Sequence, residues 1–229
     1  MRSRRLTEAE YESLVAGARV VERDAHGVKV WRLPEARMLK LFRTKRLLSS
    51  ARIRPYHRRF AANAKRLSRI GIPVPQVEAL YHIPHLSRYA VQYRMLPGRP
   101  LSAVFEGDDI LGTVERLAVF MAELHEKGVY FRSVHPGNVL LCDDGRLGLI
   151  DLQDIRFKRG PLSDARRVRN FRHLYGGGGH GRKLRALGLE PLLRSYLEAV
   201  AWDARRKAVF RRRAQSSRAL QALLENETS

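Results

Sequence analysis

The chain has 229 residues, 44% of them hydrophobic, which is enough for one domain with a sizeable core or two small lobes and excludes a disordered chain. Its 44 lysines and arginines outnumber 23 acidic residues, and the formal charge of +21 favours a polyanionic partner such as nucleic acid, anionic lipid or a phosphorylated glycan. No apolar run reaches the roughly 18 residues of a membrane helix, and the basic N-terminus lacks the apolar stretch of a secretory signal.

The first hundred residues are expected to form a β-rich unit. Thr7 and Glu10 make a capping box, which predicts a short helix that ends near Ala16. Alternating apolar residues predict strands at 19–24, 28–33, 37–42, 77–83 and 88–95. A helix is predicted at 55–70, between the third and fourth of these strands, because a proline begins the segment and a glycine follows it.

The rest of the chain is predicted to be mainly helical. A helix is expected at 111–127, and a hairpin at 139–150 around an Asp-Gly turn. The basic helices that follow are interrupted by a flexible glycine loop at 176–179. The expected organisation is therefore a β-rich N-terminal lobe at 1–95, a hinge at 96–100 and a helical C-terminal lobe at 101–229.

One stretch, YFRSVHPGNVLL at 130–141, carries residues suited to phosphoryl transfer. That reaction needs a cation for the nucleotide phosphates, oxygen ligands for Mg²⁺, and a group that orients or deprotonates the acceptor hydroxyl. Asn138 ends the stretch, and Asp151 follows the second strand of the predicted hairpin. Because a hairpin brings its two ends together, we expect Asn138 and Asp151 to serve as metal ligands.

His135-Pro136-Gly137-Asn138, followed by the hairpin and Leu149-Ile150-Asp151, resembles the catalytic loop and metal-binding aspartate of protein-kinase-like phosphotransferases. More narrowly, the chain resembles the bacterial lipopolysaccharide core kinases, which act on heptose or Kdo (3-deoxy-manno-octulosonic acid), and the InaA-like and toluene-tolerance proteins. The similarity covers roughly 18–175. It implies an α+β, two-lobed protein-kinase-like fold and ATP- and Mg²⁺-dependent phosphorylation of a sugar hydroxyl in the lipopolysaccharide inner core.

The resemblance also implies individual roles. Lys40 would pair with the ATP phosphates, while Asn138 and Asp151 would hold Mg²⁺. Leu96 would line the adenine pocket, and Gly27 is the one glycine available to cover the phosphates. The acceptor would be a glycolipid. We therefore expect a cytoplasmic protein that binds peripherally to the anionic cytoplasmic face of the inner membrane.

Three features depart from the family pattern, and the first is the glycine-rich phosphate loop, of which only Gly27 is present. Ser133 stands where the catalytic aspartate is expected, and a serine hydroxyl is a weak base. Ser133 can still orient a hydroxyl, and His135 or Asp154 can act as a relocated base. Asn63 stands where a glutamate normally pairs with the strand lysine, so Asp151 is the expected partner of Lys40 without nucleotide.

The departure at Ser133 leaves a pseudokinase scaffold as the alternative to an enzyme. Retention of Lys40, Asn138 and Asp151 favours the enzyme, because a scaffold needs no metal ligands. Nucleic-acid binding is a second alternative from charge alone, supported by an acid-free stretch at 36–77 and basic runs at 205–213. It is disfavoured because no zinc-finger spacing or aromatic-rich ribonucleoprotein pattern is present.

Two further expectations concern single residue types. The only cysteine, Cys142, excludes an internal disulfide and a cysteine zinc cluster, and we expect it to be a buried thiol in a reducing cytosol. Seven histidines form no metal-ligand spacing and are expected at the surface: His26, His57, His82, His85, His125, His173 and His180.

Overall fold

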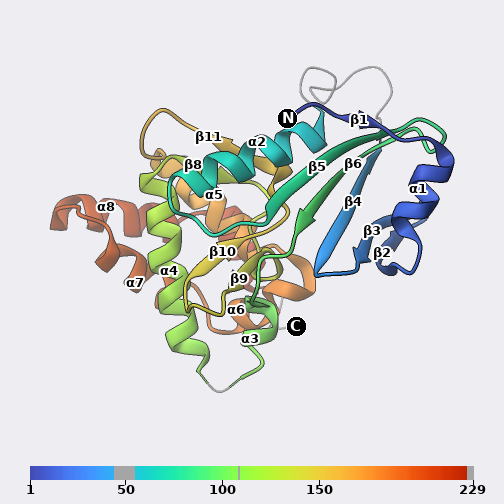
Figure 1. Cartoon of the computed structure of the whole chain (residues 1–229). Coiled ribbons are helices and arrows are strands. Elements are labelled where there is room, and N and C mark those ends of the chain that lie inside the picture. Colours follow the sequence, from blue (N-terminus) through green and yellow to red (C-terminus); the bar gives the residue numbers. More distant parts are fainter. Residues whose placement is uncertain (44–54, 108, 226–229) are drawn as a thin grey trace. The chain divides into compact units, whose positions relative to one another are not determined.

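The computed structural model describes residues 1–43, 55–107 and 109–225, and they form two compact units of mixed α/β structure (Figure 1). The first unit comprises Met1–Pro97 together with Asp151–Gln153, and the second comprises Gly98–Ile150 with Asp154–Ser229. The first is rich in strands and the second rich in helices, as the sequence predicts for the N-terminal and C-terminal parts.

The first unit is built on a six-stranded sheet in the order β1-β5-β6-β4-β3-β2. Its strands are β1 (Arg4–Arg5), β2 (Arg19–Asp24), β3 (Gly27–Leu33), β4 (Arg37–Arg43), β5 (Gln76–Ile83) and β6 (Arg88–Arg94). Five of them match the sequence prediction within one residue at each end. The short β1, which pairs in parallel with β5, was not predicted, because two exposed arginines carry no apolar pattern.

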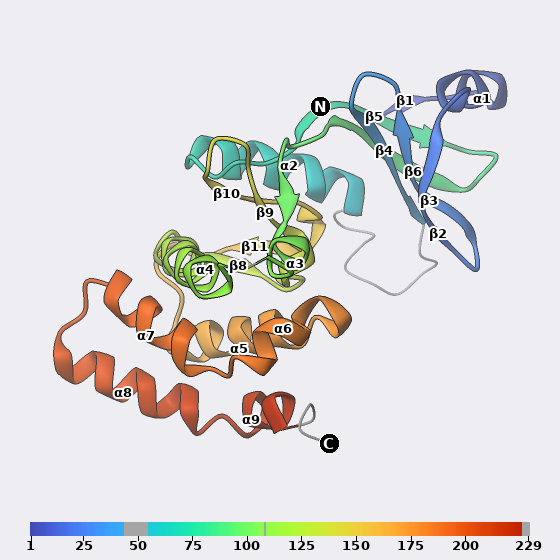
Figure 2. The ribbon, with the colours of Figure 1, turned by 90° about the horizontal axis from the view of Figure 1, so that it is seen from below.

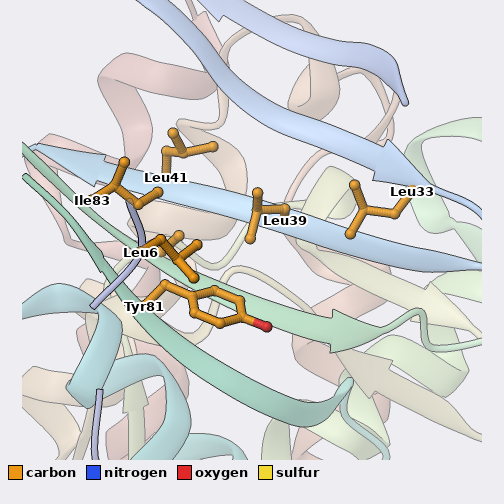
Figure 3. Close-up of a cluster of buried hydrophobic side chains, with 7 residues drawn as sticks. Leu6, Leu33, Leu39, Leu41, Tyr81 and Ile83 are labelled. Atoms are coloured by element: carbon orange, nitrogen blue, oxygen red, sulfur yellow. The ribbon is translucent and has the colours of Figure 1, made fainter. Parts of the chain in front are cut away.

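Helix α1 (Glu8–Val15) covers part of one face of this sheet, and its capping box at Thr7 and Glu10 is present as predicted. Beneath it lies a cluster of buried side chains (Figure 3): Leu6, Leu33, Leu39, Leu41, Tyr81, Ile83 and Ala90. Partly buried Tyr11 and Trp31 pack against this cluster, and the Trp31 indole donates to the Tyr11 hydroxyl at 3.1 Å. Burial of these side chains contributes to the stability of the first unit.

We expect Leu39→Ala to lower the free energy of unfolding by about 2–5 kcal/mol, because Leu39 is fully buried and its removal leaves a cavity. Chemical denaturation would measure the change. Val21→Ala on β2 is the control, since Val21 is 56% exposed and should cost less than about 1 kcal/mol. Equal losses in the two variants would contradict the burial of Leu39.

The opposite face of the sheet is covered by α2 (Tyr56–Arg69). Because side chains alternate along a strand, Phe42 and Lys40 of β4 face this side while Leu39 and Leu41 face α1. Phe60 of α2 lies 6.5 Å from the Phe42 ring, centroid to centroid. Lys40 therefore projects on the α2 side of the sheet from a strand whose neighbouring residues are buried.

The second unit contains two small sheets. They are formed by β7 (Arg99–Pro100), β8 (Val129–Phe131), β9 (Val139–Leu141), β10 (Leu147–Leu149) and β11 (Ile155–Phe157). The predicted hairpin is β9 and β10, extended by β7, while β8 pairs with β11. Gly98 has φ of +140°, and a Cβ there would come within 2.4 Å of the Leu141 carbonyl oxygen, so the start of β7 requires glycine.

Helices make up most of the second unit: α3 (Leu101–Val104), α4 (Ile110–Glu126), α5 (Asp164–Tyr175), α6 (Arg182–Ala186), α7 (Glu190–Ala199), α8 (Ala204–Gln215) and α9 (Arg218–Glu225). The view in Figure 2 shows these helices and the small sheets of the second unit. The prediction of a flexible loop at 176–179 is wrong in part: Gly178–Gly181 form a 3₁₀ turn, and the Arg185 guanidinium donates to the Tyr175 and Gly178 carbonyls at 2.6 and 3.2 Å.

The prediction that the histidines lie at the surface is wrong for His57 and His125, which are 1% and 0% exposed. His57 stacks on the Tyr89 ring, and Ser3 lies 3.1 Å from its Nε2. His125 contacts the Tyr196 hydroxyl through Nδ1 at 2.9 Å and the Asn170 amide oxygen through Nε2 at 3.2 Å. Each buried imidazole therefore has a polar partner supplied by another part of the fold.

The Tyr196 hydroxyl also accepts from the fully buried Arg167 at 2.7 Å, and Arg167 pairs with Glu126 at 2.9 Å. The guanidinium carbons of Arg167 and Arg206 lie 4.8 and 4.3 Å from the centroid of the Trp202 ring. This buried polar network links α4, α5 and α7 in the core of the second unit.

Candidate active site

Lys40 and Asp151 form an ion pair and hydrogen bond within the first unit. Lys40 lies in the middle of β4, and Asp151 lies 111 residues further along the chain, immediately after the hairpin of β9 and β10. Their side chains are 16% and 27% exposed, so both are accessible to a ligand while being partly desolvated. The pairing expected from the sequence, with Asp151 replacing a helix glutamate, is confirmed.

The backbone at Asp151 is held in an unusual conformation. Its φ of +59° lies in the left-handed region, which few residues other than glycine adopt. The Asn63 side chain on α2 donates to the Leu152 carbonyl at 2.7 Å, and so fixes the residue that follows Asp151. Asn63, at the position where the family resemblance implies a glutamate, thus holds the backbone next to the aspartate.

Gly27 and Leu96 also belong to the first unit but lie at its turns and end. Gly27 has φ of +106° at the turn between β2 and β3. The buried Arg88 holds this turn by donating to the carbonyls of His26 and Val28, the latter at 2.9 Å. Leu96 is half-buried in the extended segment after β6. No hydrogen bond or ion pair joins Gly27 or Leu96 to Lys40 in the described part of the first unit.

Ser133, His135 and Asn138 share one loop of the second unit, between β8 and β9. The Asn138 side-chain amide donates to the Ser133 carbonyl at 2.9 Å, and its backbone amide donates to the His135 carbonyl at 2.8 Å. No described residue donates to the Asn138 side-chain oxygen, which is the atom able to bind a cation. The Ile150 amide donates to the Asn138 carbonyl at 3.1 Å, so the residue before Asp151 is tied to this loop.

Ser133 and His135 differ in what they contact. The Ser133 hydroxyl donates to the Asp154 carboxylate at 3.3 Å, and the Arg132 amide donates to the Asp154 carbonyl at the same distance. His135 Nδ1 accepts from the Gly137 amide at 3.2 Å, and its ring stacks on His180 with centroids 5.1 Å apart. The structure therefore pairs Ser133 with a carboxylate and uses one nitrogen of His135 to hold the loop.

No protein-family model matches the chain, and no curated protein matches its sequence. The chain is similar to solved structures of WbdD. The 2.2 Å crystal structure of WbdD is 17% identical with a TM-score of 0.48, over 87% of this chain and 47% of that one. A structure described as the bifunctional kinase-methyltransferase WbdD has 19% identity and a TM-score of 0.48, over 87% and 46% of the two chains.

A third structure, of monomeric WbdD, is 19% identical with a TM-score of 0.46, over 86% of this chain and 44% of that one. The chain thus spans less than half the length of the WbdD chains that it matches, and the similarity is distant.

The described residues include no group of three or more histidine, cysteine, aspartate or glutamate side chains able to hold a metal. They also include no helix long and apolar enough to cross a membrane.

Cys142 is a buried free thiol, as predicted, and burial raises its pKa. Four of the basic residues in the acid-free stretch, Lys45, Arg46, Arg52 and Arg54, lie outside the described residues.

The sequence analysis did not identify two polar residues that contact β8, just before the loop that contains Ser133. Asn170 on α5 donates to the Phe131 carbonyl, and His173 lies 3.1 Å from the Tyr130 hydroxyl. Both belong to a basic helix without a recognisable motif. Their only sequence signal is their place on the buried side of an amphipathic helix, which does not distinguish a loop contact from ordinary packing.

Proposed function

We propose that the chain is a protein-kinase-like phosphotransferase that uses ATP and Mg²⁺ to phosphorylate a hydroxyl group. The observation that carries this proposal is the Lys40–Asp151 pair, which joins a strand lysine to a carboxylate in a strained backbone conformation. Strained residues that the surrounding structure holds in place are concentrated at functional sites. A partly exposed cation beside a partly exposed carboxylate is suited to a phosphate and its metal ion.

The side chains present are compatible with the two ligands. Lys40 would bind the ATP phosphates, and Gly27 and the segment at Leu96 would contact the nucleotide. Asp151 and the Asn138 side-chain oxygen would each give Mg²⁺ an oxygen ligand, the type this ion prefers. Bound Mg²⁺ would neutralise part of the negative charge on the phosphates.

We propose a sugar hydroxyl of the lipopolysaccharide inner core as the acceptor, and this choice rests on the resemblance of the loop around His135 and Asn138 to the core kinases. The charge of +21 supports the choice, because the acceptor is a glycolipid in an anionic membrane surface. The protein would then act at the cytoplasmic face of the inner membrane as a peripheral enzyme.

Asp154 is our candidate for the base. The acceptor hydroxyl would lose its proton to Ser133 as the Ser133 proton moves to the Asp154 carboxylate, while the acceptor oxygen bonds to phosphorus and ADP leaves. The 3.3 Å hydrogen bond from Ser133 to Asp154 supports this relay. His135 is the weaker candidate, because its Nδ1 already accepts from the backbone and its ring is stacked on His180.

We expect Asp154→Asn to lower kcat by about 10²- to 10⁴-fold and to leave the stabilisation by Mg·ATP unchanged, since it removes a base but no nucleotide contact. Release of ADP in the presence of core oligosaccharide would measure kcat. Asp143→Asn in the exposed hairpin turn is the matched control. If Asp154→Asn keeps full kcat while His135→Gln loses it, the base is His135.

The test of the proposed function is transfer of radioactive phosphate from γ-labelled ATP to purified core oligosaccharide, with thermal unfolding measured on the same protein. Incorporation that requires Mg²⁺ supports the enzyme. Stabilisation by Mg·ATP without any transfer supports the nucleotide-binding pseudokinase, the alternative favoured by Ser133 at the position of the expected aspartate. A protein that shows no phosphate transfer and no stabilisation by Mg·ATP would contradict both the enzyme and the pseudokinase hypotheses.

A further inference from the structure

Helix α5 packs against β8, the strand that leads into the loop containing Ser133; Figure 1 shows the helix and the strand. Two hydrogen bonds connect them: Asn170 donates to the Phe131 carbonyl, and His173 contacts the Tyr130 hydroxyl. All of these residues belong to the second unit. Asn170 and His173 therefore attach α5 to β8, and Arg169 and Arg172 are their neighbours along the helix.

Three exposed arginines occur at this place: Arg132, Arg169 and Arg172, which we call the loop arginine cluster. Arg132 directly precedes Ser133 in the chain. Arg169 and Arg172 are three residues apart on α5, a spacing that places both on one side of the helix. The cluster thus consists of one residue of the loop and two residues of α5.

The electrostatics of His173 are consistent with this grouping. Its pKa is lowered, first by burial and then by the positive charges of Arg172, Arg132 and Arg169. The positive charges of the same three guanidinium groups therefore reach one imidazole and add to the effect of burial on its pKa. Like charges so grouped repel one another, and an anion bound among them would relieve that repulsion.

No carboxylate pairs with the loop arginine cluster in the part of the chain that the structure describes. Other arginines of the second unit do have acidic partners, for example Arg146 with Asp144 and Arg211 with Glu190. With a charge of +21 many cations must be unpaired, so this alone identifies no site. The distinguishing feature is their position: Arg132 directly precedes Ser133 in the loop, and Arg169 and Arg172 lie on the helix that is hydrogen-bonded to β8.

We infer that the loop arginine cluster binds a phosphate group already present on the acceptor, so that the substrate is a phosphorylated sugar. This inference rests on the proposed function and specifies its acceptor. Guanidinium groups suit the task because their planar donors bind phosphate oxygens in pairs. Holding one phosphate at Arg132, Arg169 and Arg172 would present a neighbouring hydroxyl of the same sugar to Ser133.

The test measures binding of glucose 6-phosphate, with glucose as the neutral probe, to the full chain at 0.15 M salt and with the non-hydrolysable ATP analogue AMP-PNP and Mg²⁺ present. The variant replaces the three arginines of the cluster together: Arg132→Gln, Arg169→Gln and Arg172→Gln. The matched control removes the same charge from α8, where three exposed arginines also lack a described ion-pair partner: Arg205→Gln, Arg212→Gln and Arg213→Gln.

We expect the cluster variant to raise the Kd of glucose 6-phosphate at least about tenfold. The α8 control should change this Kd less than about threefold. The Kd of glucose should not be lower in either variant than in the wild type. Equal effects of the two triple variants would overturn the inference, because only the general positive field would then matter. So would an unchanged Kd in the cluster variant. Arg172→Gln alone should give a smaller loss in the same direction if the triple variant is poorly folded.

Vesicles of phosphatidylglycerol and phosphatidylcholine form a second arm, since a lipid headgroup carries the same phosphate chemistry. Loss of vesicle binding in the cluster variant, with glucose 6-phosphate binding intact, would overturn the inference in favour of a membrane contact. Stabilisation by Mg·ATP is recorded on the same samples. Its absence in the wild type would contradict the proposed function, whereas the binding of the sugar phosphate would still decide the role of the cluster.

Discussion

Asp151→Asn should abolish the Mg²⁺-dependent part of the stabilisation by ATP. A ligand at about 100 times its Kd stabilises the native state by about 2.7 kcal/mol, which raises Tm by several degrees. Asparagine removes the charge that would bind Mg²⁺ and that pairs with Lys40, but it tolerates the left-handed backbone at this position. Thermal unfolding with ATP, with Mg²⁺, and with both would measure the effect.

The control for this experiment is Asp144→Asn. Asp144 is an exposed aspartate of the same hairpin and pairs with Arg146, so its replacement changes the net charge equally without touching Lys40. It should retain the full response to Mg·ATP. An Asp151→Asn protein that responds to Mg·ATP as strongly as the wild type would contradict the role of Asp151 as a metal ligand.

The second unit should lose stability as the pH falls below 6.5, because burial lowers the pKa of His125 to about 3. In the unfolded chain this pKa returns to its ordinary value near 6.5. The unfolded state therefore binds the proton first, and the stability that is fully present above pH 6.5 is lost as pH falls toward 3. From His125 alone we expect unfolding to require about 2 kcal/mol less at pH 5 than at pH 8.

Chemical denaturation followed by circular dichroism at pH 8, 6 and 5 would measure this loss. His125→Gln should be less stable at pH 8 but show a flatter pH dependence, since glutamine does not titrate. His180→Gln at an exposed position is the control and should keep the wild-type dependence. A His125→Gln protein with an unchanged slope would show that other groups cause the acid sensitivity.

The strands and helices that were predicted best are those that a short local sequence pattern determines. The alternation of apolar residues located β2 to β6, the Asp-Gly turn located the hairpin of β9 and β10, and Thr7 with Glu10 located α1. These signals act within a few residues and need no knowledge of the tertiary structure. The pairing of Lys40 with Asp151 was also expected, although it spans 111 residues, because the motif around Asn138 defined the place of the aspartate.

Features that depend on distant partners were missed. His125 was expected at the surface, and it is buried because Tyr196 and Asn170, which lie 71 and 45 residues away, satisfy its ring nitrogens. From the sequence, Asn63 was expected only to remove the glutamate that normally pairs with the strand lysine. In the structure its side chain donates to the Leu152 carbonyl, next to Asp151. Such polar contacts produce no periodic pattern of residue types along the sequence, so only the folded structure reveals them.

The two tryptophans of the chain are divided between its units, with Trp31 against the β-sheet cluster and Trp202 beside Arg167 and Arg206. Each unit therefore has one tryptophan of its own, whose fluorescence can be excited separately from that of the tyrosines. Trp31→Phe would leave an emission signal from the helical unit alone, and Trp202→Phe one from the β-rich unit alone. This pair of single-tryptophan proteins would show whether the two units melt in one transition or in two.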